Sequence, residues 1–300
     1  MTKTGRALQL PTKRRWPFTL AALQYPNYRL WFFGQATSLT GTWMQSVAQG
    51  WLVYQLTGSR FALGVVSFAG TIPTLFLMLP AGAVADRVPR RQLLLMAQIA
   101  MMVFAFVLAG LTAAGILRTW HVGLLAFGLG VANSFDAPTR QALAVELVED
   151  RRDLMNAIAL NSTMFNLARI IGPAVGGLVL AALGPAWCFA LNGLSFLAVI
   201  GALRLMRLPQ ITRPARTEPL TTQIAAGLCY ISDHLLIRTM IALLGISSLF
   251  GLSYATLMPV YAVDVLHVGE TGLGALNAAV GVGALTGSLV VALSLIHISE

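Results

Sequence analysis

The sequence has little charge for its length. Asp, Glu, Lys and Arg together make up 10% of its 300 residues, whereas apolar residues make up 57%. Soluble domains carry about 25% charged residues, so the composition excludes an ordinary soluble domain. The few charges are also unevenly spread, because long uncharged stretches separate them. These stretches cover residues 30–59, 61–85, 92–117, 170–203, 239–263 and 271–299.

Cysteines and motifs that carry chemistry are equally scarce. Cys188 and Cys229 fall in different regions and form no Cys-x-x-Cys pair, and the four histidines are scattered. We therefore expect no disulfide framework, no metal site and no cofactor. The sequence has no Gly-x4-Gly-Lys-Ser/Thr loop for direct use of ATP and no Gly-x-Ser-x-Gly elbow of a hydrolase. We expect a protein that is not an enzyme.

The uncharged stretches are long enough for transmembrane helices. A bilayer core needs roughly 20 apolar residues per helix, and a helix satisfies its own backbone hydrogen bonds in lipid. The stretch 170–203 is too long for one crossing and contains Gly184–Pro185, a natural turn. We predict an all-α polytopic membrane protein with eight helices, at about 28–54, 62–84, 92–115, 120–141, 155–182, 186–206, 238–261 and 271–292.

The basic residues predict the orientation of these helices. All 20 except Arg60, Arg118 and Arg169 precede the first helix or fall in connections on one side of the membrane. Because basic connections stay in the cytoplasm, we predict a cytoplasmic N-terminus and a multi-pass protein of the bacterial inner membrane, in contact with its lipids. This placement accounts for the net charge of +9 without nucleic acid, which we do not expect as a partner.

The charge pattern also divides the chain. Residues 1–27 form a predicted cytoplasmic segment, residues 28–206 a first six-helix bundle, and residues 207–237 a cytoplasmic connector rich in proline and charge. Residues 238–292 supply two more helices. Their layout, a helix ending at Tyr, a short polar hairpin and a Gly/Ala-rich helix, is similar to that of residues 54–72, so we interpret them as the start of a second copy. The last eight residues, LSLIHISE (293–300), resemble the translated end of a sequencing adapter, and we expect them to be non-native.

Three motifs resemble the major facilitator superfamily. Gly82-x3-Asp86-Arg87-x2-Arg90-Arg91 is similar to its cytoplasmic loop signature, although Val88-Pro89 stands where the later Gly is usual. Gly172-Pro173-Ala-Val-Gly176-Gly177 is similar to the Gly-Pro motif of antiporter-type members. The segment 135–177 resembles the branch that holds the enterobactin exporter and related secretion proteins. The resemblance covers residues from about 20 to 292.

The resemblance implies a twelve-helix bundle, of which about eight helices are present here. It also implies a monomeric secondary transporter in which two six-helix bundles rock about a central cavity, driven by protons. The expected activity is export of a small, siderophore-like organic molecule. A broad multidrug exporter of the same fold and an inactive truncated fragment remain alternatives. The resemblance makes Asp86, with Arg87, Arg90 and Arg91, part of a cytoplasmic latch or gate, whereas the residue types alone also fit a simple anchor at the membrane surface.

A polar stripe runs along the first predicted helix. Gln35, Ser38, Thr42, Gln45 and Gln49 are spaced 3, 4, 3 and 4 residues apart, which places them on one helical face. A polar stripe is unfavourable in lipid, so it must face water or protein. We expect it to line the substrate cavity together with Trp43, Asn133 and Asn166. Hydrogen bonding between packed helices is the alternative.

Arg169 lies inside a predicted helix, where an arginine costs about 2.5–3.5 kcal/mol on insertion scales. Asp136 is its nearest plausible partner, and Arg140 follows Asp136 by one helical turn. We consider three roles for Asp136: a proton site coupled to Arg169, a gating or structural ion pair, and placement near the interface with Arg140. All three residues are candidates for coupling or gating.

Small residues mark expected helix contacts. Gly172, Pro173, Gly176 and Gly177 in one helix, and Gly283 and Gly287 in the last one, form surfaces of small residues that allow close approach. In the superfamily these two helices meet across the two halves. Smooth contacts of this kind suit rocking, and static packing is the alternative.

Overall fold

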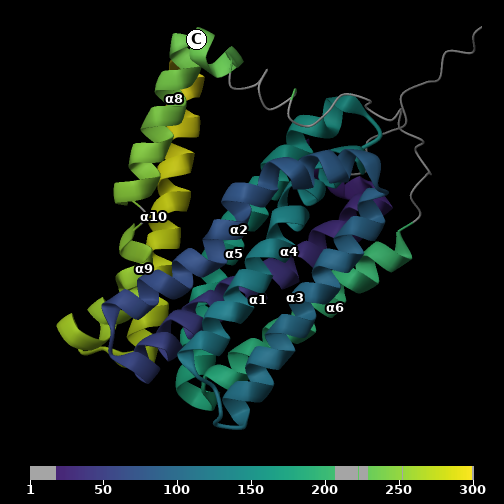
Figure 1. The fold of residues 1–300 in the computed structure, drawn as a ribbon. Coiled ribbons are helices and arrows are strands. Elements are labelled where there is room, and N and C mark those ends of the chain that lie inside the picture. Colours follow the sequence, from purple (N-terminus) through teal and green to yellow (C-terminus); the bar gives the residue numbers. More distant parts are fainter. Residues whose placement is uncertain (1–17, 207–221, 223–228, 252, 299–300) are drawn as a thin grey trace, which may run out of the picture.

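The computed structural model describes residues 18–206, 222, 229–251 and 253–298. This part of the chain contains helices and turns but no strand, which confirms the all-α prediction. Six long helices form the bundle in Figure 1. They are α1 (Pro26–Thr57), α2 (Arg60–Arg87), α3 (Arg90–Ala113), α4 (Thr119–Glu146), α5 (Leu154–Leu183) and α6 (Pro185–Leu205). Each overlaps the helix expected at its place in the sequence.

The turns between the helices follow from local sequence. α1 ends at Gly58, whose left-handed backbone (φ 58°) suits glycine, and the side chain of Ser59 then caps α2 by accepting a hydrogen bond from the Ala62 backbone N–H. Gly184 (φ 85°) separates α5 from α6, which begins at Pro185. The expected turn at Gly184–Pro185 is therefore present.

The six helices pack closely. α1 lies against α5 and α6, α2 against α4, and α3 against α4 and α6. Four helical segments are long and apolar enough to cross a bilayer by length and composition, namely Arg60–Ala85, Arg90–Ala113, Arg151–Leu183 and Pro185–Leu205. α1 and α4 are as long but carry the polar residues described below, which lower their mean hydropathy. The molecule is a multi-pass membrane protein.

The seventh predicted helix is present, but its described residues do not form one regular α-helix. In place of one helix over 238–261, the chain forms α8 (Leu235–Ile246), a π-helical turn (Ser247–Gly251), α9 (Ser253–Val260) and a second π-helical turn (Tyr261–Val265). Pro259 lies just before the second turn and cannot donate the backbone hydrogen bond of a regular helix. Serine and glycine, both weak helix formers, occupy the first turn.

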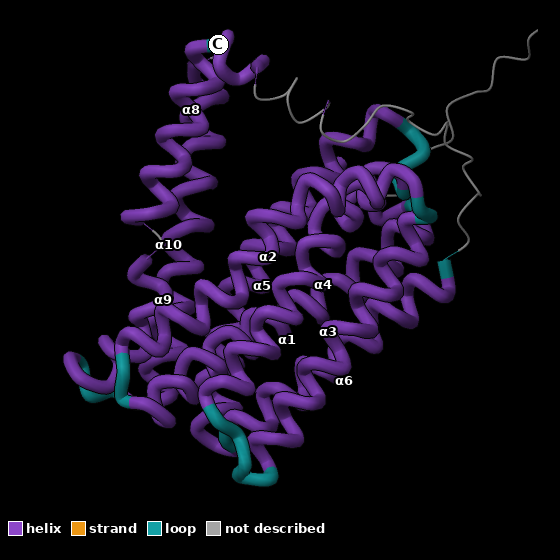
Figure 2. The backbone as a smooth tube through the Cα atoms, viewed as in Figure 1, coloured by secondary structure: helices purple, strands orange, loops and turns teal. Residues whose placement is uncertain are grey.

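α10 (Gly269–Ile298) packs along α5, so the fifth and eighth membrane helices are in contact. α8 contains no buried residue and stands away from the six-helix bundle, whereas α9 and the start of α10 meet it (Figures 1 and 2). The second segment of the chain therefore touches the first mainly at one end.

Several sequence predictions fall where the structure gives no description. Residues 1–17, most of the predicted connector (207–221 and 223–228) and residues 299–300 of the predicted non-native tail lie outside the described residues. The side chain of Asp86 is also outside them, so its role as a latch stays a prediction.

Candidate substrate cavity

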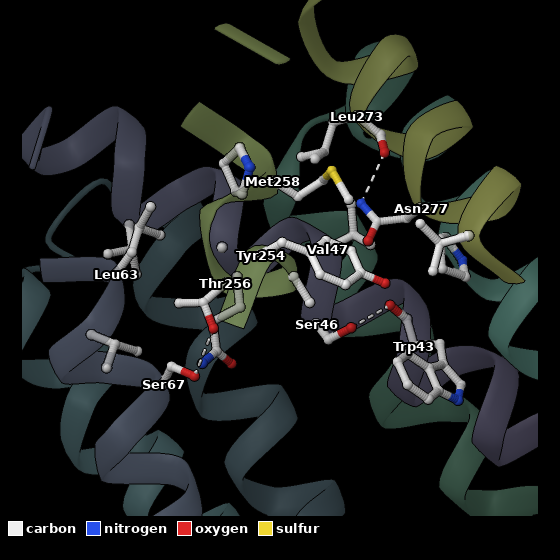
Figure 3. Close-up of a pocket in the computed structure, with 18 of the residues that line it drawn as sticks. Trp43, Ser46, Val47, Leu63, Ser67, Tyr254, Thr256, Met258, Leu273 and Asn277 are labelled. Atoms are coloured by element: carbon white, nitrogen blue, oxygen red, sulfur yellow. Dashed lines mark hydrogen bonds between the residues drawn. The ribbon is translucent and has the colours of Figure 1, made fainter. Parts of the chain in front are cut away.

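A cavity of about 330 Å³ lies where the first six helices meet the later ones. α1, α2 and α5 form one wall, and α9 and α10 form the other (Figure 3). Its size is in the range of small-molecule sites. The lining residues used below are Trp43, Gln49, Ser67, Arg169, Tyr254, Thr256 and Asn277.

The lining is mostly apolar and aromatic, with a few polar groups. Most of the polar side chains already have partners in the protein. Ser67 and Thr256 approach each other with 3.4 Å between their hydroxyl oxygens, and the Asn277 side-chain amide donates to the Leu273 carbonyl at 2.9 Å. Within the described part of the chain, the lining contains one charged residue, Arg169, and no Asp or Glu.

Arg169 lies against Trp43 rather than against an acid. Its guanidinium carbon is 5.7 Å from the centre of the Trp43 ring, which also meets Phe165 edge-on at 5.8 Å. Among the described residues Arg169 has no ion pair, so the expected partnership with Asp136 is wrong. The guanidinium instead interacts with the face of an aromatic ring, a favourable arrangement for a cation.

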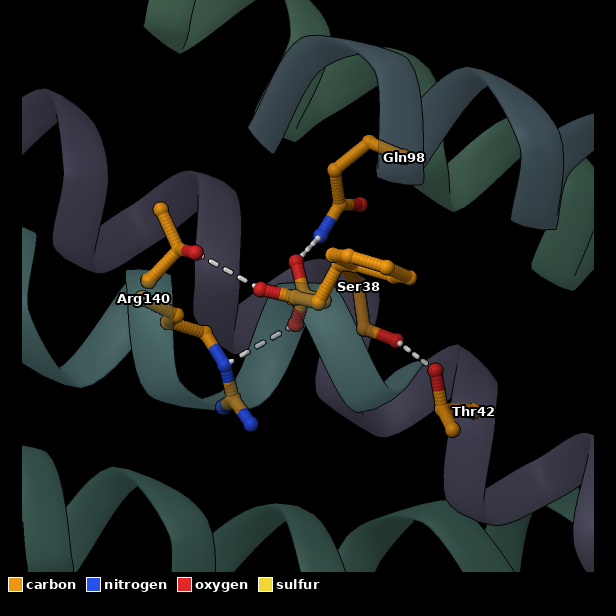
Figure 4. Close-up of polar contacts among 7 residues, drawn as sticks. Ser38, Thr42, Gln98 and Arg140 are labelled. Atoms are coloured by element: carbon orange, nitrogen blue, oxygen red, sulfur yellow. Dashed lines mark hydrogen bonds and ion pairs between the residues drawn. The ribbon is translucent and has the colours of Figure 1, made fainter. Parts of the chain in front are cut away.

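Asp136 has different partners (Figure 4). Only 4% of the residue is exposed, and its Oδ1 accepts a hydrogen bond of 2.7 Å from the side-chain amide of Gln98 on α3. Its Oδ2 lies 3.2 Å from Arg140 Nε, one turn further along α4. This is a buried ion pair tied to a neighbouring helix. Of the three roles considered, this geometry favours the structural or gating ion pair.

The polar stripe of α1 divides between the cavity and helix packing. Gln49 lines the cavity, as does Trp43 beside the stripe. Gln45 is buried and accepts a 2.7 Å hydrogen bond from Asn192 on α6. Gln35 and Ser38 are also buried in the bundle. Thr42 donates to the Ser38 carbonyl at 2.9 Å (Figure 4). The position of Gln49 is therefore compatible with the cavity interpretation, and the contact of Gln45 is compatible with the packing interpretation.

Neither of the two asparagines expected in the cavity is among its lining residues. Asn133 on α4 is exposed. Asn166 on α5 donates to the Ser162 carbonyl of its own helix at 3.0 Å. Sequence spacing placed both residues on a polar face but could not show which helices surround the cavity.

The glycines of α5 mark its contacts with two helices. A Cβ atom at Gly172 would lie 2.5 Å from Trp43 Cβ, and one at Gly176 would lie 3.2 Å from Met44 Cα, both on α1. A Cβ at Gly177 would lie 2.7 Å from the Cα atom of Gly274 on α10. Pro173 lines the cavity. α5 therefore approaches both α1 and α10 through backbone.

The glycines expected to pack in the last helix are not the ones in contact. A Cβ at Gly283 or Gly287 would meet nothing within 4 Å in the described part of the chain. Gly274 and Gly281 make the contacts instead, and a Cβ at Gly281 would lie 3.1 Å from the Arg169 carbonyl oxygen. The register of α10 on α5 therefore differs from the one expected.

The basic loop after α2 lies at one end of the bundle with other polar links. Arg90 pairs with Glu146 at 2.8 Å, and Arg91 donates to the Arg204 carbonyl at 2.8 Å. Arg87 is exposed. A Cβ at Gly82 would meet nothing within 4 Å in the described part of the chain, so no close helix contact depends on this glycine.

The same end includes the short helix η1 (Phe18–Gln24). Gln24 and Tyr25 both donate to Oδ2 of Asp153, at 2.7 and 3.0 Å. Burial and this hydrogen bond raise the pKa of Tyr25, so its hydroxyl stays a donor. The basic connections predicted to lie on one side of the membrane are therefore linked to each other by hydrogen bonds and an ion pair.

A second set of contacts lies at the opposite end. Tyr54 of α1 donates to Oδ2 of Asp264 at 2.6 Å, and Arg60 lies 3.4 Å from the same oxygen. Four residues at this end or in the cavity lining were not predicted from the sequence as site residues, namely Asp264, Tyr254, Thr256 and Asn277. Asp264 could have been found as an acid at the end of a long uncharged stretch, and Asn277 as an amide within a Gly/Ala-rich helix.

The contact between Ser67 and Thr256 predicts a cross-link. In a variant with Cys188 and Cys229 replaced by alanine, S67C and T256C are expected to form a disulfide under mild oxidation, because the native oxygens are 3.4 Å apart. Cleavage at a protease site placed in the 207–221 segment would then leave the two parts joined until reduction. A matched pair with cysteine at Gly123 and Thr256 should not cross-link.

The comparisons with known proteins agree with this architecture. Residues 18–297 match the family described as transmembrane secretion effector. The chain belongs to this family. The resemblance to the major facilitator superfamily that its motifs indicated is therefore confirmed, and members of the family are transporters rather than enzymes.

Proteins similar to the chain include transporters whose names point to different substrates. The chain is 29% identical over 265 residues to the multidrug efflux pump Tap of Mycolicibacterium fortuitum, covering 86% of the chain and 64% of the pump. It is 27% identical to the staphyloferrin A transporter of Staphylococcus aureus, covering 77% and 58%. It is 29% identical to the enterobactin exporter EntS of Citrobacter koseri, covering 92% and 66%. The chain thus spans between 58% and 66% of the length of these relatives.

Proposed function

We propose that this transmembrane secretion effector is a secondary active exporter of small organic molecules, with siderophore-like substrates as the first candidates. The observation that carries the proposal is the cavity between α1, α2 and α5 on one side and α9 and α10 on the other. A site between two parts of the chain can change its access when the parts rock against each other. The cytoplasmic N-terminus predicted from the basic residues is part of the proposal.

The distribution of contacts supports alternating access. At the Asp264 end, hydrogen bonds join the two parts of the chain beside the cavity. Toward the other end α8 has no buried residue and stands away from the bundle (Figure 1). If the basic end is cytoplasmic, as we propose, these contacts support an inward-facing arrangement, in which the cavity would load substrate from inside.

Multidrug export is the second candidate. The mostly apolar and aromatic lining favours it, because such a surface accepts many shapes. The similarity to Tap supports multidrug export to the same degree that the similarity to EntS supports siderophore export. The third candidate is that this chain is inactive without further helices.

Transport in inverted membrane vesicles tests the proposal. Vesicles from a strain that expresses the chain are expected to take up a radiolabelled catecholate siderophore or ethidium when an inward-acid pH gradient is imposed. Uptake should stop when nigericin dissipates the gradient. Vesicles without the chain are the control. Uptake of ethidium but not of the siderophore would favour multidrug export, and uptake of neither by a well-expressed chain would contradict the proposal.

Proton coupling through Asp136 has its own test. Asp136→Asn keeps the shape of the side chain and an oxygen that can accept from Gln98, but it leaves Arg140 without its carboxylate. We therefore expect the variant to insert and fold with lowered stability, and its uptake is compared at equal amounts of folded protein. If Asp136 carries the proton, uptake should lose its dependence on pH in the same vesicles. If uptake keeps its normal pH dependence, Asp136 is only a structural partner of Arg140.

A further inference from the structure

We propose that Arg169 makes the cavity selective for aromatic molecules that carry a carboxylate or a similar anionic group. The inference deepens the proposed function and rests on it, because it assumes that this cavity is the transport site. It names a substrate class that neither the family nor its relatives, with their different substrates, determine.

The charge balance of the cavity is the first argument. Among the lining residues that the structure describes, Arg169 is the one charged residue, and none of them is Asp or Glu. Among the described residues Arg169 makes no ion pair, and it is half-buried. A half-buried cation that faces an aromatic ring but no acid is incompletely compensated, and an anionic ligand would supply the missing countercharge.

The hydrogen bonding of the lining is the second argument. Ser46 donates to the Trp43 carbonyl, Asn277 to the Leu273 carbonyl, and Ser67 and Thr256 meet each other (Figure 3). These neutral groups are partly satisfied within the protein. The guanidinium of Arg169, in contrast, has five N–H donors, and their planar arrangement matches a carboxylate.

The position of Arg169 over Trp43 is the third argument. The separation of 5.7 Å between the guanidinium carbon and the ring centre places the cation over the indole face, which limits its freedom before a ligand arrives. Trp43 and Tyr254 both contribute to the lining, so an aromatic ligand has ring surfaces to contact beside the cation. An organic cation would meet positive charge with no acid to balance it.

A matched set of three probes tests the inference. 2-Naphthoate, 2-naphthamide and 2-naphthylmethylammonium share one ring system and differ in charge. Their binding to the chain in phosphatidylcholine nanodiscs can be measured by equilibrium dialysis at pH 7, with empty nanodiscs as the control. We expect naphthoate to bind at least ~10-fold more tightly than the amide, as a charge-assisted hydrogen bond allows, and the ammonium to bind most weakly.

Two variants of Arg169 separate selectivity from packing. Arg169→Gln should reduce naphthoate binding to the level of the amide while amide binding stays within about 2-fold of the wild type. Arg169→Lys should keep part of the preference, because it retains the charge without the planar fork. An equal loss of all three probes in Arg169→Gln would show that Arg169 only supports the cavity, and would overturn the inference.

A variant that leaves Arg169 in place covers the case in which Arg169→Gln does not fold. Gln49→Glu adds an acid to the same lining and should abolish the preference for naphthoate. An unchanged preference in a folded Gln49→Glu variant would overturn the inference. Equal binding of the three probes to the wild-type chain would also overturn it but would leave the proposed transport site standing. No binding of any probe would count against the transport site itself.

Discussion

Asp136→Leu is expected to lower the stability of the chain by about 3 kcal/mol, the usual result of breaking a buried ion pair by removing one partner. The substitution leaves Arg140 with only 15% of its side chain exposed and without its carboxylate, and it removes the acceptor of the Gln98 amide. Thermal unfolding of the detergent-solubilised protein, followed by tryptophan fluorescence, should show a midpoint lowered by roughly 10 °C.

The double variant Asp136→Leu/Arg140→Met is the matched control. Replacing both members of a buried pair with apolar residues is often close to neutral, so this variant should recover most of the lost stability. Gln98 would still lack its acceptor, which limits the recovery. If the double variant is as unstable as Asp136→Leu, the pair is not the source of the effect.

Gly130→Ala is expected to cost about 1–3 kcal/mol, the range for overpacking a close contact. A Cβ atom at Gly130 on α4 would overlap the carbonyl oxygen of Gly70 on α2 and would lie 3.2 Å from Pro73. The backbone oxygen cannot rotate away as a side chain can, so the two helices must separate. The same thermal unfolding experiment measures the loss.

Gly123→Ala provides the comparison within the same helix. A Cβ at Gly123 would meet nothing within 4 Å, and alanine favours a helix by up to about 1 kcal/mol over glycine. This variant should be neutral or slightly more stable. Similar effects of the two substitutions would show that the close approach of α2 and α4 does not determine the loss.

The sequence predicted the first six helices better than the irregular helical segment 235–265. Charge-free stretches and Gly184–Pro185 were enough to locate α1 to α6, because length and hydropathy determine membrane crossings. The π-helical turns on either side of α9 depend on local hydrogen bonding. Pro259 was the available signal for them, yet a single proline is often accommodated in a membrane helix.

The candidate site was predictable only in part. Trp43 and Gln49 were predicted as cavity residues and Arg169 as a coupling or gating residue, and all three line the cavity. The partner of Arg169 was not predictable, because the spacing within α4 and α5 does not show which faces meet. Gln98 on α3 binds Asp136, and Asn192 on α6 binds Gln45. Neither contact leaves a periodic pattern in the sequence.

Three buried or partly buried polar links of the first six helices join residues of the same bundle. Gln98 and Asp136, Gln45 and Asn192, and Arg90 and Glu146 all pair within residues 18–206. Both members of each pair are therefore synthesised before α8. The first six helices can therefore fold during translation, and the later helices then pack against the folded bundle.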